Sequence, residues 1–303
     1  MTHTACYRGR FAPTPSGPLH FGSLVAALGS FLDARAAGGE WRVRIEDIDP
    51  PRCPPGTDTT ILRQLDAFGL EWDGAVVWQS ARGDAYQAAL ERLIDQGLAY
   101  PCSCSRKQWQ AHAIYPGWCR DGLCEPGKPI AWRLRSDLGR RPVIWHDRLF
   151  GEQCFDPAEL GDVVLKRKDG LWAYQLAVVV DDAEQRISDV VRGVDLLDNT
   201  PWQGQLQTAL GYPELRYLHL PLVMSTEGQK LSKQNLAPAL ESEPNAIARQ
   251  LFQAIATLDQ APPAELEGAP PAEQLAWAVA NWRVERITPA QERPLPAAPR
   301  ESS

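Results

Sequence analysis

The sequence predicts an α/β protein built on a parallel sheet, and three observations near its start support this. An alternating run at 7–11, a helical run at 24–36 and a second alternating run at 41–45 follow one another. Gly38 and Gly39 end the helical run. This order of strand, helix and strand is a βαβ unit, in which ligands bind beyond the carboxyl ends of the strands.

The turn FAPTPSGPLHFGS, residues 11–23, leads from the first strand directly into the helix. A tight Pro/Gly turn before a helix forms an anion site, because the unpaired N–H groups of the first helical turn point at its occupant. His20 and Ser23 face the same place. Taken alone, the turn fits an ordinary strand-to-helix connection equally well.

Two helices are expected next, because apolar residues at helical spacing end at Gly69 and Gly97. A β-rich insertion then interrupts the sheet, with strands at 130–135 and 143–149 and a hairpin of 163–166 with 171–177. The later elements are strands at 178–180, 187–191 and 217–224, and helices at 199–210, 245–258 and 273–287.

These patterns divide the chain into five segments. We expect a Rossmann-like nucleotide-binding domain in two parts, an inserted α+β subdomain, a short helical segment, and a disordered tail rich in Pro, Ala and Arg. In that order, the boundaries are 1–98 and 178–235 for the domain, 99–177 for the insertion, 236–287 for the helices and 288–303 for the tail.

The composition is that of a globular protein, with 44% hydrophobic and 23% charged residues. A net charge of −7 argues against a protein that coats nucleic acid through bulk positive charge, but it permits a local basic groove. No apolar stretch is long enough to span a bilayer, and no signal-peptide pattern begins the chain. We therefore expect a cytoplasmic protein with reduced cysteines.

Four of the seven cysteines fall within one short stretch, as Cys102, Cys104, Cys119 and Cys124. Structural zinc binds four ligands, chiefly thiolates and imidazoles, so spacing alone selects these four, with His112 in reserve. Unbound, reduced cysteines are the alternative. A zinc ion here would be structural and would tie down the insertion.

A second polar loop, KLSKQ at 230–234, places Lys230 and Lys233 after the strand at 217–224. Two ammonium groups suit a polyphosphate leaving group, although two lysines in a loop are more often simply solvated. Together with the turn at 11–23, however, this loop resembles the HIGH and KMSKS signatures of class I aminoacyl-tRNA synthetases.

Four longer segments resemble the glutamyl/glutaminyl branch of that family, in the correct order. Ser23 and Gln234 depart from the generic signatures, and only the role of Gln234 is put in doubt. The four segments are RFAPTPSGPLHFGS at 10–23, RIEDIDPPR at 44–52, YQLAVVVDD at 174–182 and VVRGVDLLDNTPWQ at 190–203.

The resemblance implies specific ligand contacts. Without it, Glu46 would be taken as a helix cap and Tyr174 as a core residue. Glutamate would contact Arg10, Ala12, Thr14, Glu46, Tyr174 and Arg192. ATP, with Mg²⁺, would contact His20, Gly22, Ser23 and Lys233, and the catalytic residues would be His20, Lys230 and Lys233. The family pattern C-x-C…Y-x-x-x-C assigns zinc to Cys102, Cys104, Tyr115 and Cys119, in place of Cys124.

A full glutamyl-tRNA synthetase has an anticodon-binding region after the lysine loop, where this sequence has about seventy residues. The resemblance is to a short paralogue. It implies a monomer that converts L-glutamate and ATP to glutamyl-adenylate without tRNA. Glutamate then passes to the queuosine at the wobble position of tRNA(Asp). The alternatives are a minimal synthetase core that charges a tRNA 3′ end, and a non-catalytic zinc-stabilised RNA-binding paralogue.

Overall fold

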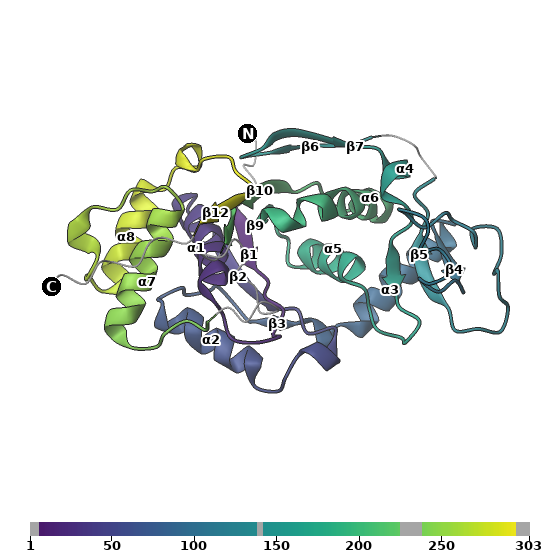
Figure 1. Ribbon diagram of the computed structural model, residues 1–303, viewed down its shortest axis with the longest axis horizontal. Coiled ribbons are helices and arrows are strands. Elements are labelled where there is room, and N and C mark those ends of the chain that lie inside the picture. Colours follow the sequence, from purple (N-terminus) through teal and green to yellow (C-terminus); the bar gives the residue numbers. More distant parts are fainter. Residues whose placement is uncertain (1–5, 138–141, 225–237, 295–303) are drawn as a thin grey trace.

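The computed structural model describes residues 6–137, 142–224 and 238–294. Two sheets lie side by side at its centre (Figure 1), where the N–H of Ser188 donates to the carbonyl oxygen of Arg8 at 2.9 Å. The first sheet has the order β1-β2-β3 and is parallel throughout. Its strands are β1 (Arg8–Phe11), β2 (Glu40–Ile45) and β3 (Val77–Trp78). The predicted βαβ unit is confirmed.

The second sheet has the order β7-β6-β10-β9, and β10 runs parallel to both of its neighbours. Only β7 is antiparallel, as the second arm of a hairpin with β6. The strands are β6 (Val143–Asp147), β7 (Gly151–Phe155), β9 (Asp189–Gly193) and β10 (Arg216–Leu220). Residues 143–155, expected within the insertion, thus extend a central sheet.

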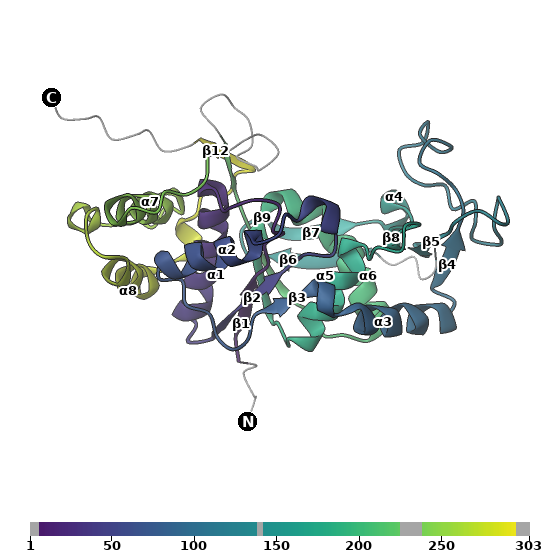
Figure 2. The same cartoon turned by 90° about the horizontal axis from the view of Figure 1, so that it is seen from below.

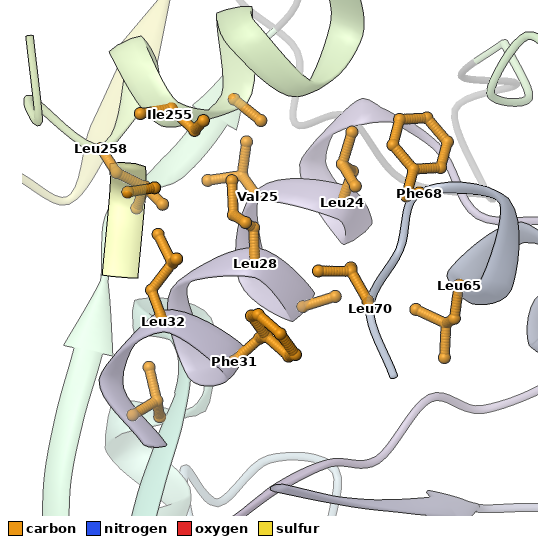
Figure 3. Packing of buried hydrophobic residues seen from close by; sticks show 14 of the residues in the cluster. Leu24, Val25, Leu28, Phe31, Leu32, Leu65, Phe68, Leu70, Ile255 and Leu258 are labelled. Carbon is orange, nitrogen blue, oxygen red and sulfur yellow. The ribbon is translucent and has the colours of Figure 1, made fainter. Parts of the chain in front are cut away.

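Helix α1 (Phe21–Ala36) is the core helix, because Leu24, Leu28 and Leu32 on it are fully buried. Figure 3 shows these leucines packed between Leu65 and Leu70 on one side and Ile255 and Leu258 on the other. Each such side chain contributes roughly 1.5–3 kcal/mol by burial. The covering helices are α2 (Thr57–Ala67), α7 (Pro244–Thr257) and α8 (Pro271–Asn281).

A separate antiparallel sheet, of order β4-β5-β8, lies at the opposite end of the molecule from α7 and α8 (Figures 1 and 2). A second hydrophobic core connects it to the central part through three helices. The strands are β4 (Ala99–Cys102), β5 (Ala131–Leu134) and β8 (Val164–Lys166). The helices are α3 (Gly83–Asp95), α5 (Tyr174–Glu184) and α6 (Thr200–Leu210), and α4 (Pro157–Leu160) is a single turn.

The prediction of strands at 171–177 and 178–180 was wrong, because these residues enter α5 at Tyr174. Every residue from Gln175 to Asp182 is buried, and residues 176–180 form a continuous apolar run within the helix. A continuous apolar run lacks a period that distinguishes a buried helix from a buried strand. Only an isolated bridge between Lys166 and Trp172 remains of the predicted hairpin.

The helix predicted at 199–210 is confirmed as α6, which ends at Gly211 with a φ of +66°. Part of the tail expected to be disordered is ordered: β12 (Glu292–Pro294) pairs in parallel with β11 (Leu222–Met224). Paired backbone groups hold this segment although its composition is poor in apolar residues. Within the three described ranges, no helix combines the length and the apolar character needed to cross a membrane.

Candidate active site

A cavity of about 620 Å³ lies where β1, β2 and β9 end. It brings together every residue that the sequence analysis assigned to glutamate, although they come from four separate parts of the chain. These residues are Arg10, Ala12, Thr14, Glu46, Tyr174 and Arg192. The position agrees with the rule that ligands bind beyond the carboxyl ends of parallel strands.

Arg10 is held in this cavity by a buried ionic network. Its Nε lies 3.2 Å from Oδ1 of Asp182, and Nη1 of Arg44 lies 2.8 Å from the same oxygen. Arg44 also donates from Nη2 to Oε1 of Glu46 at 3.3 Å. Burial opposes ionisation of Asp182, but Arg10 and Arg44 outweigh it and lower the pKa of that carboxyl. Asp182 therefore stays ionised and fixes the Arg10 guanidinium.

Arg192 is buried like Arg10, at 5% exposed, but unlike Arg10 it has no carboxylate partner among the described residues. Its guanidinium donates to Nε2 of His219 at 3.1 Å, to Oε1 of Gln203 at 2.8 Å and to Oγ1 of Thr200 at 2.9 Å. All these partners are neutral groups, and Arg192 forms no ion pair within the described residues. A buried charge is costly without a counter-ion, so this arrangement favours a bound anion.

His219 and Asp147 together orient the guanidinium of Arg192. Nδ1 of His219 lies 2.6 Å from Oδ2 of Asp147, and Nε2 faces Nε of Arg192. Because an arginine only donates, Nε2 must accept, and the proton sits on Nδ1, which donates to Asp147. Burial, supported by the charge of Arg192, lowers the pKa of His219 against the opposing effect of Asp147, so the ring is neutral.

No sequence motif pointed to this orienting pair, because neither residue belongs to a recognisable one. Asp147 ends β6 and His219 lies in β10, 72 positions further along the chain. A lone histidine in an apolar strand carries no local sign of its partner. Asp182 and Arg44 were likewise missed, although both stand inside segments that carried the family resemblance.

Glu46 has an unusual acidity for a carboxyl group. Burial raises its pKa to about 7, against the lowering effect of Arg44 and Arg10. The group therefore changes charge near neutral pH. When an ammonium group binds beside it, the ionised form is favoured.

We expect the KM for glutamate in tRNA-free ATP–pyrophosphate exchange to rise about tenfold between pH 8 and pH 6. Below pH 7 Glu46 is protonated and loses its attraction for the α-ammonium group, and each pH unit then lowers the ionised fraction about tenfold. In Glu46→Gln, KM is expected to be high and nearly independent of pH over this range. An unchanged pH profile in this variant would assign the titration to another group.

The same substitution is expected to stabilise the protein at high pH. The pKa of Glu46 is higher in the folded than in the unfolded chain, so its stabilising effect is present below pH 4.5 and is lost as pH rises through 7. Glu46→Gln should therefore raise the free energy of unfolding at pH 8 by about 2–3 kcal/mol, and by less at pH 5. Urea titration measures both values, with the exposed Glu273→Gln as the matched control.

The predicted ATP contacts lie at the start of α1. His20 is the N-cap residue, and its Nδ1 accepts a hydrogen bond from the N–H of Ser23 at 3.3 Å. Gly22 and Ser23 occupy the first helical turn, which contains no acidic residue that would repel phosphate. None of these three residues lines the cavity described above. Lys230, Lys233 and Gln234 lie outside the described residues.

The sulfur atoms of Cys102, Cys104 and Cys119 are buried and lie within 4.8 Å of one another. The Tyr115 hydroxyl joins them, 3.3 Å from Sγ of Cys102 and 3.5 Å from Sγ of Cys104. Three sulfurs and one oxygen around a common centre fit the tetrahedral preference of zinc. The donor set is therefore consistent with a structural zinc site.

Cys124 lies at the edge of this cluster, and its side chain also interacts with the thiols of Cys104 and Cys119. Its thiol is exposed and points to the carbonyl oxygen of Trp118, at 3.4 Å, while its N–H donates to Sγ of Cys119, also at 3.4 Å. Burial opposes ionisation of Cys119. The backbone N–H groups of Cys124 and Ser103 outweigh it and, with further hydrogen bonds, lower its pKa to about 5. Cys124 thus supports a thiolate ligand through its backbone.

The fold and the cavity correspond to the catalytic core of a class of tRNA synthetases. The sequence matches the family described as "tRNA synthetases class I (E and Q), catalytic domain" over residues 7–113 and 121–246. A glutamate tRNA ligase from Elizabethkingia meningosepticum, solved in complex with its amino acid, matches the structure with a TM-score of 0.79 and 25% identity. That match covers 94% of this chain and 66% of the ligase.

Curated relatives define the group more narrowly. A "Glutamyl-Q tRNA(Asp) synthetase" from Thiobacillus denitrificans is 52% identical over 306 residues, covering 98% of this chain and 100% of the relative. The protein of that name from Chromobacterium violaceum is 53% identical, covering 96% of this chain and 98% of the relative. The chain therefore belongs to the class I tRNA synthetases for glutamate and glutamine and, within them, to the glutamyl-Q tRNA(Asp) synthetases.

Proposed function

We propose that this protein activates L-glutamate with ATP, without requiring tRNA, and transfers it to the queuosine at the wobble position of tRNA(Asp). The observation that carries the proposal is the charge pattern of the cavity: Arg192 has only neutral partners, while Glu46 supplies a carboxylate in the same cavity. This pattern matches an amino acid that bears both an ammonium group and a side-chain carboxylate.

Within this cavity, Arg192, Arg10 and the Tyr174 hydroxyl would bind the carboxylates of glutamate, and Glu46 would bind its α-ammonium group. Ala12 and Thr14 would complete the wall around the amino acid. The guanidinium groups are fixed in advance, Arg10 by Asp182 and Arg192 by His219, so binding requires little reorganisation. All these residues belong to one chain, and a monomer suffices.

In the first step, an α-carboxylate oxygen of glutamate attacks the α-phosphorus of ATP. The bond from this phosphorus to the bridging oxygen breaks, and pyrophosphate leaves with the electron pair. The step needs no general base, because a carboxylate is already ionised at neutral pH. His20, the first turn of α1, Lys230, Lys233 and Mg²⁺ would stabilise the negative charge that develops on the phosphates.

In the second step, a hydroxyl oxygen of the queuosine cyclopentenediol attacks the acyl carbon of glutamyl-adenylate. The acyl–phosphate bond breaks, AMP leaves with the electron pair, and the hydroxyl proton passes to a phosphate oxygen of the departing AMP. Zinc takes no part in either step. It would be held by Cys102, Cys104, Tyr115 and Cys119, and would stabilise the insertion. Because its substrates are ATP and a tRNA, we infer that the reaction takes place in the cytoplasm.

Labelled glutamate tests the proposal when it is offered with ATP and three forms of tRNA(Asp). The forms carry queuosine, lack queuosine, or carry queuosine but lack the 3′-terminal adenosine. We expect pyrophosphate exchange without tRNA, and labelling of both queuosine-containing forms but not of the queuosine-free form. Nuclease digestion should place the label in the anticodon loop. Two results would instead indicate a synthetase core that charges the 3′ end. These are labelling of queuosine-free tRNA, and absence of label from the queuosine-containing tRNA that lacks the 3′-terminal adenosine.

A further inference from the structure

The cavity extends beyond the residues assigned to glutamate. Its outer part, here called the outer cavity, has two walls from different parts of the fold. One wall consists of Ile48, Asp49 and Arg52, which follow β2. The other consists of Val164, Arg167 and Trp172, which belong to β8 and to the turn after it in the insertion. Neither the adenylate chemistry nor the zinc site uses these six residues.

The rim of the outer cavity carries both arginines and carboxylates. Oδ2 of Asp49 lies 2.7 Å from Nε of Arg52 and 3.3 Å from Nη1 of Arg167, and Nη2 of Arg167 also lies 2.6 Å from Oδ2 of Asp169. The arginine side chains are 65% and 45% exposed, respectively, and stand at the rim. Within the described residues, Asp49 and Asp169 take up Nη1 and Nη2 of Arg167, whereas Arg52 is paired through Nε alone, so its two Nη groups can reach a ligand from solution. Such a rim suits the phosphate groups of a nucleic acid.

Trp172 gives the outer cavity an aromatic wall. Its ring packs edge-to-face against Tyr86, with 5.7 Å between the centroids, and Nζ of Lys166 lies 4.2 Å from the ring centre. These contacts leave the indole half-buried and part of the cavity lining. The Lys166 ammonium covers one face of the ring, so a nucleobase would stack on the part of the indole that lines the cavity.

The wall that carries Trp172 is anchored to the rest of the insertion. The N–H of Arg167 donates to the carbonyl oxygen of Leu171 at 2.8 Å and closes the turn. Nζ of Lys168 donates to the carbonyl oxygen of Ser103 at 2.6 Å, and Ser103 lies between the proposed zinc ligands Cys102 and Cys104. The zinc site thus supports the turn, and Trp172 is positioned before any ligand arrives.

Transfer of an acyl group requires the attacking oxygen to approach the acyl carbon to about 3–3.5 Å. The accepting nucleotide must therefore enter the cavity that already contains glutamate, and the outer cavity is the part left for it. We propose that the outer cavity is the acceptor-nucleotide subsite. Trp172 stacks on the modified base, and Arg52 and Arg167 bind the flanking phosphates. The inference rests on the proposed function and adds residues that recognise its RNA substrate.

The test compares two reactions of the same variant protein. In Trp172→Ala, we expect kcat/KM for glutamate transfer to queuosine-containing tRNA(Asp) to fall about tenfold to a hundredfold, as for loss of one base–aromatic stack. Glutamate-dependent pyrophosphate exchange without tRNA should stay within about twofold of the wild type, because the adenylate step does not need the outer cavity. Trp172→Phe retains a stacking surface and should recover most of the transfer.

Trp277→Ala is the matched control, since this tryptophan on α8 is half-buried, like Trp172, and does not line the cavity. Arg167→Gln removes a half-exposed rim charge without disturbing the core, so it tests the subsite even if Trp172→Ala does not fold. It should raise the KM for tRNA and weaken the salt dependence of tRNA binding.

Normal transfer by both Trp172→Ala and Arg167→Gln would overturn the subsite, and so would an equal or larger loss in Trp277→Ala. Wild-type protein that labels queuosine-free tRNA would contradict the proposed function itself. The two failures are therefore distinguishable.

Discussion

Replacing Arg192 with glutamine is expected to lower kcat/KM for glutamate in ATP–pyrophosphate exchange by about a hundredfold to a thousandfold. The guanidinium has only neutral partners among the described residues, so the substrate carboxylate would be its counter-ion. A buried charge-assisted hydrogen bond to a carboxylate is among the strongest single contacts a ligand makes. Glutamine retains some hydrogen bonding but neither the charge nor the fork of two donors.

The exposed Arg249→Gln on α7 is the matched control and should leave exchange unchanged. Arg192→Lys restores the charge without the planar fork, and should fall between the wild type and the glutamine variant. Thermal unfolding separates the binding effect from a loss of structure. If Arg192→Gln binds glutamate as the wild type does, Arg192 is a purely structural cation, and the assignment of this cavity to glutamate fails.

Replacing Cys119 with alanine is expected to abolish zinc retention, from one ion per chain to almost none after dialysis. Hydrogen bonds lower the pKa of the Cys119 thiol to about 5, whereas burial raises the pKa of Cys104, whose sulfur lies 3.5 Å away. Structural zinc contributes its binding energy directly to folding. We therefore expect a lower melting temperature as well. Elemental analysis and thermal unfolding, with and without a chelator, measure the two effects.

Tyr115→Phe and Cys124→Ala decide which residue is the fourth ligand. The Tyr115 hydroxyl lies among the buried sulfurs, whereas the Cys124 thiol is exposed and directed to a carbonyl oxygen. We expect Tyr115→Phe to weaken zinc binding in a chelator competition and Cys124→Ala to leave it nearly unchanged. The reverse order would assign the ligand to Cys124.

Local patterns were sufficient to predict much of the fold. The turn at 11–23 and the helix after it were recognisable because glycine, proline and apolar spacing act over a few residues. The same holds for α6, whose Pro201 and Gly211 mark its two ends. The apolar run that begins α5 was misassigned because burial on every side removes the period on which such predictions depend.

In the candidate site, too, some residues could be identified from the sequence and others could not. Arg10, Glu46 and Arg192 stand in segments that resemble motifs of the family, and that resemblance identified them. Asp147 and His219 were not identified, because a hydrogen bond between two strands leaves no trace in the sequence near either residue. The outer cavity was missed for a related reason: its walls follow β2 and β8, which are far apart in the chain.

The sequence by itself determined that this chain carries segments resembling the family's glutamate-binding motifs, and so that two arginines and a glutamate are expected in one site. Only the tertiary structure decided what those charges do. Arg10 and Arg192 look alike in the sequence, yet Arg10 is neutralised by Asp182, 172 residues away, while Arg192 has neutral partners. Ion pairing acts through space, so it depends on which elements fold side by side, and no local pattern encodes that.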